Sequence, residues 1–274
     1  MNSRGPLTEN QWSQIQSEIV REARRTLVAR RFLGIYGPLG AGIESVRLET
    51  YGADRDAEID LVGRHDPDPI QATEETYVRV PIIYKDFILH WRDVELSSKL
   101  GAPLDASRAI RAAHFVADRE DNLLFNGEAR FGIKGLLQAE GRLTVKRGDW
   151  SKFGQAYQDV VNASEALLAQ NHHRPFALAV STKDYSRLIR QGEGQFAPEL
   201  DTILRLCDDG VYTSPVIPEG KAVLLSTGDQ NFDIAVAEDL TVTFLGERDQ
   251  DYPFRVYECL VLRIKRPQAI CTIE

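Results

Sequence analysis

Asp86 and His90 are the two residues whose types and spacing come closest to a catalytic arrangement. Both lie in an alternating segment that predicts a strand, and residues four positions apart on a strand share a face. A carboxylate beside an imidazole could act as a general acid–base pair. Four residues at about 3.3 Å each, however, place the two Cα atoms roughly 13 Å apart. The side chains cannot meet on a straight strand, so structural roles are favoured for both.

Other signatures of catalysis, metal binding and nucleotide binding are missing from the sequence. It contains no His-Glu-x-x-His, no paired Cys-x-x-Cys, no Glu-x-x-His and no Gly-x-Ser-x-Gly. Gly127 and Gly132 have the spacing that opens a P-loop, but Ile133 stands where the lysine must follow. We therefore predict a protein that is not an enzyme and that has no catalytic residues, no metal and no cofactor.

Composition and charge narrow the class of protein further. Of the 274 residues, 43% are apolar and 27% are charged, which is ordinary for a soluble globular chain. No stretch approaches the roughly 18 apolar residues of a membrane span, and the first residues lack the apolar core of a signal peptide. The net charge of −8 disfavours a binder of free duplex DNA, and three scattered cysteines indicate a reducing cytoplasm. We predict a cytoplasmic protein that binds neither a membrane nor nucleic acid.

The first predicted element is a helix from Thr8 to about Arg31, stopped by Gly34. Thr8 and Gln11 have the spacing of a capping box, in which each side chain bonds to the backbone of the other residue. One apolar stripe follows at steps of three and four residues: Trp12, Ile15, Ile19, Ala23 and Leu27.

The remaining elements mix helices and strands and predict an α+β fold. Residues 43–80 are typical of a long β-hairpin with little core of its own. Residues 77–91 predict one strand, with Trp91 on the same face as Phe87 and Leu89, and packing at the core or at an interface is favoured for Trp91 over exposed stacking. Helices are predicted over 103–127, 153–170, 181–189 and 199–207, and strands over 176–180, 222–226, 232–237, 240–244, 254–264 and 269–273.

Several segments resemble the encapsulins, bacterial shell proteins with the fold of tailed-phage major capsid proteins. They occur in the same order along nearly the whole chain: ARRFLGIYGPLG at 29–40, PIIYKDFILHWRD at 81–93, EDNLLFNG at 120–127, GIKGLL at 132–137, PFRVYE at 253–258 and LRIKRP at 262–267. The resemblance implies a structural protein that assembles with itself into a closed icosahedral nanocompartment around cargo enzymes. Residues 84–91 and the C-terminal segment look closest to the subgroup with ferritin-like, iron-oxidising or iron-storage cargo; a peroxidase is the other expected cargo.

The resemblance also implies a division of the chain into four parts. Residues 1–42 would form the N-terminal helix and arm. Residues 43–80 would be the extension loop, or E-loop, which reaches across a neighbouring copy. Residues 81–133 and 226–274 would form the peripheral domain with its spine helix, and residues 134–225 the axial domain at the symmetry axes.

Two candidate sites follow from the resemblance. A pocket for a C-terminal targeting peptide of the cargo is implied at five positions: Leu27, Arg30, Gly34, Leu240 and Val242. Arg30 would pair with a carboxylate or carbonyl of the peptide, and Gly34 stands where some members have an acid. The same five residues are equally consistent with an ordinary core.

The second candidate site is a pore loop formed by Gly192, Glu193, Gly194 and Gln195. Copies of Glu193 around a symmetry axis would make an acidic ring. The alternative for this loop is a mobile surface turn.

Two other functions stay open from the sequence. A phage or prophage major capsid protein would share the fold but would package DNA, for which the net charge is poorly suited. A peptidase or a bacteriocin-like enzyme would need a nucleophile or metal constellation that the sequence does not contain.

Overall fold

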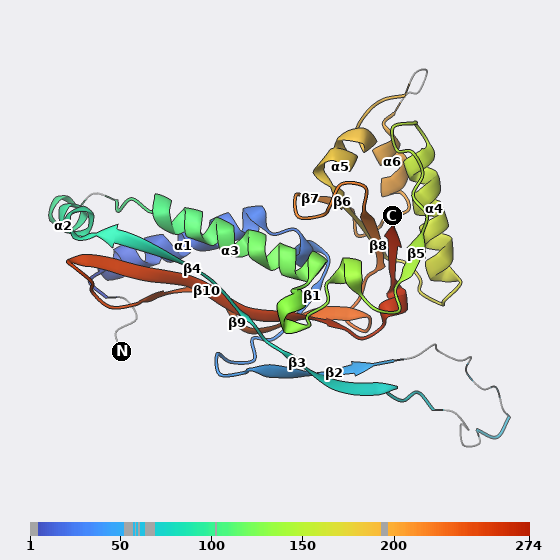
Figure 1. The fold of residues 1–274 in the computed structure, drawn as a ribbon, viewed down its shortest axis with the longest axis horizontal. Helices are drawn as coiled ribbons and strands as arrows, with labels where there is room; N and C mark the ends of the chain where they lie inside the picture. The colour runs from blue at the N-terminus through green and yellow to red at the C-terminus, as the bar shows by residue number, and fades with distance from the viewer. Residues whose placement is uncertain are drawn as a thin grey trace.

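The computed structural model describes residues 5–51, 57, 59, 61–63, 69–101, 103–192 and 197–274. These residues form two units, each a β-sheet with helices packed on it, and a long two-stranded hairpin that projects from the first unit (Figure 1). The arrangement agrees with the α+β fold predicted from the sequence.

The first unit is built on a four-stranded sheet in the order β1-β9-β10-β4. Its strands are β1 (Gly34–Tyr36), β4 (Ile82–His90), β9 (Phe232–Phe244) and β10 (Asp251–Ile264). Helices α1 (Glu9–Thr26) and α3 (Ser107–Asn126) lie together along this sheet (Figure 1). Alternate residues of β4 join them in one hydrophobic core: Ile83, Phe87 and Leu89. Burial of this face supplies the main driving force for packing the unit.

Helix α1 begins as predicted but ends earlier. The Gln11 N–H donates to the Thr8 hydroxyl at 3.3 Å, and the Thr8 N–H donates to Gln11 Oε1 at 2.9 Å, which completes the capping box. The helix ends at Thr26, and a 3-10 turn, η1 (Ala29–Arg31), follows. Asp121 of α3 accepts hydrogen bonds from the N–H groups of Val28 and Ala29 at 2.9 and 3.0 Å. These contacts hold the chain in the turn where the sequence pattern predicted further helix.

The second unit is built on a five-stranded sheet in the order β5-β11-β8-β6-β7. Its strands are β5 (Leu143–Val145), β6 (Phe176–Ser181), β7 (Val211–Ser214), β8 (Ala222–Ser226) and β11 (Ile270–Ile273), and its helices are α4 (Gln155–Leu168), α5 (Thr182–Leu188) and α6 (Glu199–Leu204). Strand β6 is buried along its whole length, as predicted for a core strand. Strand β11 pairs with β5 and β8, although the sequence analysis grouped residues 226–274 with the first unit. The chain passes from one sheet to the other through the short turn η4 (Pro267–Ala269).

The hairpin consists of β2 (Ser45–Thr50) and β3 (Glu74–Arg79), which pair antiparallel. It extends away from the first sheet below the second unit in the view of Figure 1. The prediction of a long hairpin within residues 43–80 is confirmed for these two strands.

The prediction of one strand over residues 77–91 is wrong. Pro81, which has no N–H to donate to a strand ladder, separates β3 from β4. Trp91 does not lie on the strand face, because it begins helix α2 (Trp91–Leu100), which the sequence analysis missed. Trp91 is 39% exposed, and the Arg92 guanidinium lies 5.5 Å from its ring centroid. Gly101 ends this helix at a φ of 63°, in the left-handed region that favours glycine.

Candidate functional site

A groove of about 380 Å³ runs between the C-terminal half of α1 and strand β9. Four apolar and four charged residues line it: Val20, Ala23, Leu27 and Leu240, with Arg24, Arg30, Arg31 and Asp239. Ala23 and Leu27 form a small apolar cluster with Ala117 of α3, and Leu240 packs against that cluster. The groove therefore combines apolar and charged side chains, which is chemistry suited to a peptide with apolar anchors.

An irregularity in β9 brings Asp239 and Leu240 to this groove. These two residues of β9 stand opposite the single residue Glu258 in the ladder with β10. Such a β-bulge interrupts the ladder and redirects side chains. The sequence pattern predicted separate strands over 232–237 and 240–244, whereas the structure joins them in one strand because a bulge accommodates the extra residues.

Arg30 is the centre of a charge cluster beside the groove, which is buried at Glu120 and Glu258 and exposed at Asp239. Its Nε donates to Glu120 Oε1 at 2.6 Å, its Nη1 to Asp239 Oδ1 at 2.8 Å and its Nη2 to Glu258 Oε2 at 3.1 Å. The Glu120 and Glu258 side chains are 0% and 1% exposed. The three carboxyl groups come from α3, β9 and β10, so one guanidinium joins the turn η1 to both the helix and the sheet. We call these four residues the Arg30 cluster.

The four residues of the Arg30 cluster differ in the direction and cause of their pKa shifts. Burial alone would lower the pKa of Arg30, but the Glu120 and Glu258 carboxylates raise it above the usual value of an arginine. Burial raises the pKa of Glu120 against the opposing effect of Arg30. Burial and the neighbouring Glu120 raise the pKa of Glu258 well above its usual range. Partial burial acts in the same direction on Asp239, but the hydrogen bond and positive charge of Arg30, together with the hydrogen bond from the Leu240 N–H, outweigh it and lower that pKa.

Three of the five positions implied by the resemblance line the groove: Leu27, Arg30 and Leu240. Val242 does not, because it is only 3% exposed and packs in the core of the first unit. Gly34 does not either. It begins β1 and lines a different cavity, and a Cβ at this position would stand 1.8 Å from Asp229 Oδ1. The structure therefore brings Leu27, Arg30 and Leu240 together at the groove and does not bring Val242 or Gly34 to it.

Four further lining residues were missed by the sequence reasoning: Val20, Arg24, Arg31 and Asp239. The spacing of the first three could have indicated them, because steps of three, four and seven residues from Leu27 place them on one side of the predicted helix. Asp239 had none, because only the bulge in β9 carries its side chain to Arg30.

The structure separates the two residues that first suggested acid–base chemistry. Arg255 donates to Asp86 at 2.7 and 2.9 Å, while His90 Nδ1 lies 2.8 Å from Asp251 Oδ1.

Burial raises the pKa of two cysteine thiols to about 12: Cys207 and Cys271. In the part of the chain that the structure describes, no group of three or more His, Cys, Asp or Glu side chains is placed to hold a metal ion. None of the helices among the described residues is long and apolar enough to cross a membrane.

Residues 1–261 match the Linocin_M18 family, which is described as the encapsulating protein for peroxidase. The chain belongs to this family of encapsulin shell proteins. The type 1 encapsulin shell protein EncA of Myxococcus xanthus is 42% identical over 273 residues, which cover 100% of this chain and 95% of EncA. A diheme-cytochrome–encapsulin shell fusion protein of Kuenenia stuttgartiensis is 42% identical over 268 residues, which cover 98% of this chain and 74% of that protein.

Solved structures share the fold of this encapsulin. A virus-like particle from Pyrococcus furiosus matches with a TM-score of 0.78 at 21% identity, covering 97% of this chain and 100% of that one. The capsid of the Myoviridae phage XM1 matches with a TM-score of 0.63 at 14% identity, covering 88% of each chain. The predicted capsid-like fold class is confirmed. The family match also confirms a structural shell protein rather than an enzyme, so the peptidase and bacteriocin-like hypotheses are wrong.

The predicted pore loop of this encapsulin lies mostly outside the described residues. Gly192 is described, and it follows Gln191, which forms an isolated bridge with Pro198. The other three residues are not: Glu193, Gly194 and Gln195. The acidic ring therefore stays a prediction.

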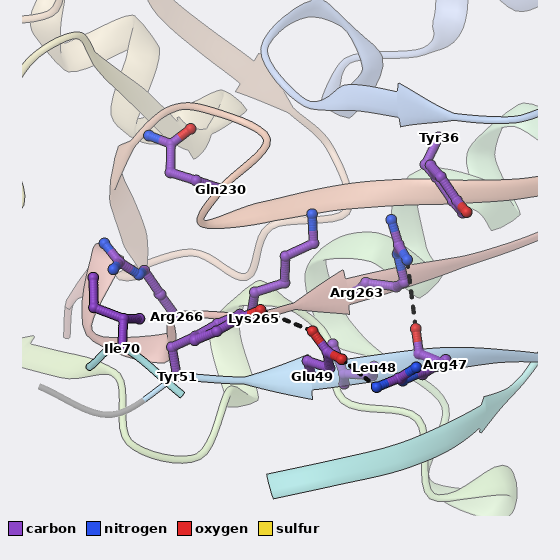
Figure 2. Close-up of a pocket in the computed structure, with 10 residues that line it drawn as sticks. All are labelled: Tyr36, Arg47, Leu48, Glu49, Tyr51, Ile70, Gln230, Arg263, Lys265 and Arg266. Atoms are coloured by element: carbon purple, nitrogen blue, oxygen red, sulfur yellow. Dashed lines mark hydrogen bonds and ion pairs between the residues drawn. The ribbon is translucent and has the colours of Figure 1, made fainter. Parts of the chain in front are cut away.

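A second and larger cleft of about 560 Å³ lies where the encapsulin hairpin meets the first sheet (Figure 2). Ten residues line it: Tyr36, Arg47, Leu48, Glu49, Tyr51, Ile70, Gln230, Arg263, Lys265 and Arg266. Arg263 donates twice to Asp233 at 2.7 Å, and its guanidinium lies 3.9 Å from the Tyr36 ring centroid. The Tyr51 N–H donates to the Lys265 carbonyl at 2.9 Å. The last of these contacts joins the residue after β2 to the residue after β10 and so ties the hairpin to the first sheet.

Proposed function

We propose that copies of this encapsulin assemble in the cytoplasm into a closed icosahedral shell that encloses cargo enzymes. The β2–β3 hairpin supports assembly, because an isolated two-stranded hairpin is marginally stable in water and gains stability from a partner. In this proposal the hairpin is the extension loop, the first unit is the peripheral domain, and the second unit is the axial domain with β11 included. The loop at 192–195 would line a pore.

The single observation that carries the cargo proposal is the groove between α1 and the β9 bulge. We infer that it receives the C-terminal targeting peptide of a cargo protein. Leu27 and Leu240 would contact the apolar anchors of that peptide. Burying one aliphatic anchor stabilises a complex by about 1.5–3 kcal/mol, whereas an exposed ion pair contributes about 0–1 kcal/mol. The apolar contacts should therefore dominate affinity.

Arg30 has a different role in the proposal from the one implied by the resemblance. Three of its N–H groups already donate to carboxylates of its own chain. Its main contribution would therefore be to hold the wall of the groove in place. Pairing with a carbonyl or carboxylate of the peptide would be secondary.

A ferritin-like protein is the proposed cargo. A ferritin-like–encapsulin shell fusion protein of Pyrococcus furiosus supports this choice; it is 25% identical over 207 residues, which cover 76% of this chain and 56% of that protein. The family description names peroxidase, and the relative from Kuenenia stuttgartiensis is fused to a diheme cytochrome. Mass spectrometry of proteins enclosed in shells from the native host would decide among the three classes.

Groove variants test the docking model. Val20 is 38% exposed at the groove wall, so Val20→Asp should leave folding intact while placing a charge against the apolar anchor. Val20→Thr, with nearly the same volume, is the matched control. With cargo co-expressed at limiting amounts, Val20→Asp should give closed but nearly empty shells, and Val20→Thr should load much closer to the parent level. Normal loading of Val20→Asp shells, judged by electron microscopy and by the ratio of cargo to shell protein, would place the docking site elsewhere.

A further inference from the structure

The Arg30 cluster contains two buried carboxyl oxygens that make no hydrogen bond to another described group: Glu120 Oε2 and Glu258 Oε1. Both residues give their other oxygen to Arg30. Arg30 Nε and Nη2 are neighbouring donors on one edge of the guanidinium, so the two carboxyl groups that they bind lie side by side. Two ionised carboxylates have no proton to donate, so a bond between them requires that one carries a proton. Buried polar atoms are usually satisfied, and a proton shared between the two carboxyl groups would supply a donor that the buried pair otherwise lacks.

Charges around this pair favour the same conclusion. Arg30 of the turn η1 contacts both carboxyl groups. Among the described residues it is the one cation that forms an ion pair with them. Carboxyl and thiol groups of the other packed elements lie close enough to interact with it electrostatically: Asp121 of α3, Asp239 of β9 and Cys259 of β10. One guanidinium cannot compensate all of these acids if every carboxyl is ionised, and an uncompensated buried charge is costly.

We propose that Glu120 and Glu258 share one proton, and that this proton holds residues 27–31 against α3 and β10 and so keeps the wall of the groove in place. Loss of the proton in alkaline solution leaves two adjacent buried carboxylates on one guanidinium, and the turn loosens. Because this turn carries Leu27, Arg30 and Arg31, the groove becomes proton-linked. The regulatory part of the inference rests on the proposed docking function, whereas the shared proton does not.

The sign of the effect follows from linkage. Burial raises the pKa of both carboxyls in the folded chain, so the folded state binds more protons than the unfolded state above the ordinary pKa of glutamate. The stabilisation is therefore fully present in acid and is lost as the pH rises through the raised pKa values. Asp121 also has a raised pKa, of about 7, so its titration changes stability in the same direction. The Glu120–Glu258 pair must therefore be examined above pH 7, where Asp121 has already lost its proton.

Glu258→Gln tests the shared proton, because it replaces one of the two titratable carboxyl groups. The glutamine oxygen can accept from Arg30 and its amide can donate to Glu120, so the side chain resembles a glutamic acid that never loses its proton. Glu120→Gln is the second variant, in case the first fails to fold. Glu238→Gln makes the same change beside the bulge, at a partly exposed residue outside the cluster, and serves as the matched control.

Two measurements on the assembled protein need no cargo. Infrared difference spectra between about pH 7 and pH 10 should show a protonated carboxyl in the parent and in Glu238→Gln, and its loss in Glu258→Gln and Glu120→Gln. Amide hydrogen exchange, corrected for its intrinsic rate, should show protection of residues 27–31 falling about tenfold for each pH unit above the raised pKa in the parent. In Glu258→Gln this protection should change less than twofold.

The outcomes separate the inference from the docking proposal. Absence of the protonated carboxyl signal, or the same pH dependence of exchange in Glu258→Gln and the parent, would overturn the shared proton. If both signals behave as expected but Val20→Asp shells load normally, the proton-linked turn stands and the docking function at this groove fails.

Discussion

Arg30 and Asp239 are 209 positions apart in the chain, yet Arg30 Nη1 donates a 2.8 Å hydrogen bond to Asp239 Oδ1. This contact joins the turn after α1 to the bulge of β9. The same bulge presents Leu240 to the groove. The wall of the groove and the Arg30 cluster are therefore one structure, so substitutions in the cluster should alter stability and groove shape together.

Replacement of Arg30 by methionine should strongly destabilise the fold. The change keeps much of the apolar stem but leaves Glu120 and Glu258 buried without their cation, which typically costs about 3–5 kcal/mol. Urea unfolding would measure the loss. Arg24→Met is the control, because Arg24 lines the exposed groove wall and a surface substitution there should cost at most about 0.5 kcal/mol. A similar small cost for Arg30→Met would show that the cluster does not depend on the guanidinium.

Val242→Asp should prevent folding rather than produce empty shells. Val242 is 3% exposed in the core, and an unpaired charge there meets no compensating group in an apolar environment. Val242→Ala, which only removes volume, should cost about 2 kcal/mol and still assemble. The yield of soluble protein and the thermal midpoint check both variants. Soluble, well-folded Val242→Asp protein that lacks cargo would instead return this residue to the docking site.

Deletion of residues 50–72 should abolish closed shells. The deletion removes most of the arm between β2 and β3, and with it the surface proposed to reach a neighbouring copy. Size-exclusion chromatography and electron microscopy should show monomers, small oligomers or aggregates. Circular dichroism should still report the two folded units, whose cores lie outside the deletion. Intact closed shells from this variant would contradict the arm assignment.

The charge of Glu193 should control cation entry if its copies surround a pore. An acidic ring raises the local concentration of cations, so Glu193→Lys should slow iron uptake by shells loaded with a ferritin-like protein. Added salt should reduce the difference, since screening weakens the field of the ring. Glu193→Gln should have an intermediate effect. Identical uptake rates at low salt would remove Glu193 from the iron path.

Asp121 should make stability depend on pH between about 4 and 7. Its pKa is raised from 3.8 to about 7 by burial, against the hydrogen bonds from Ala29 and Val28. The folded state therefore holds this proton longer than the unfolded state, and the contribution is present below about pH 4 and lost as the pH rises through 7. Asp121→Asn cannot titrate, so its urea midpoint should vary less over this range. Asn should also lower stability at every pH, because one amide oxygen cannot replace two carboxylate oxygens. Parallel pH profiles for the parent and the variant would assign the dependence to other groups.

The sequence by itself determined much of this protein. The capping box at Thr8 and Gln11, the buried run of β6 and the alternating face of β4 depend on neighbouring residues, so local rules were sufficient to predict them. The segments similar to encapsulins were also readable, because family motifs are carried in the order of residues. The mixed α+β fold and the long hairpin followed from these patterns.

Only the tertiary structure decided where the groove lies and which residues form it. Val242 and Leu240 are two positions apart and look alike in the sequence, yet the sheet buries one and the bulge presents the other. The sequence resemblance implied that Arg30 binds the cargo peptide, whereas in the structure carboxyl groups from α3, β9 and β10 accept its hydrogen bonds. Strand β11 joined the second sheet because its partners, β5 and β8, come from distant parts of the chain. Such features depend on contacts between residues far apart in sequence, and a bulge or a buried charge cluster arises only when those segments pack together.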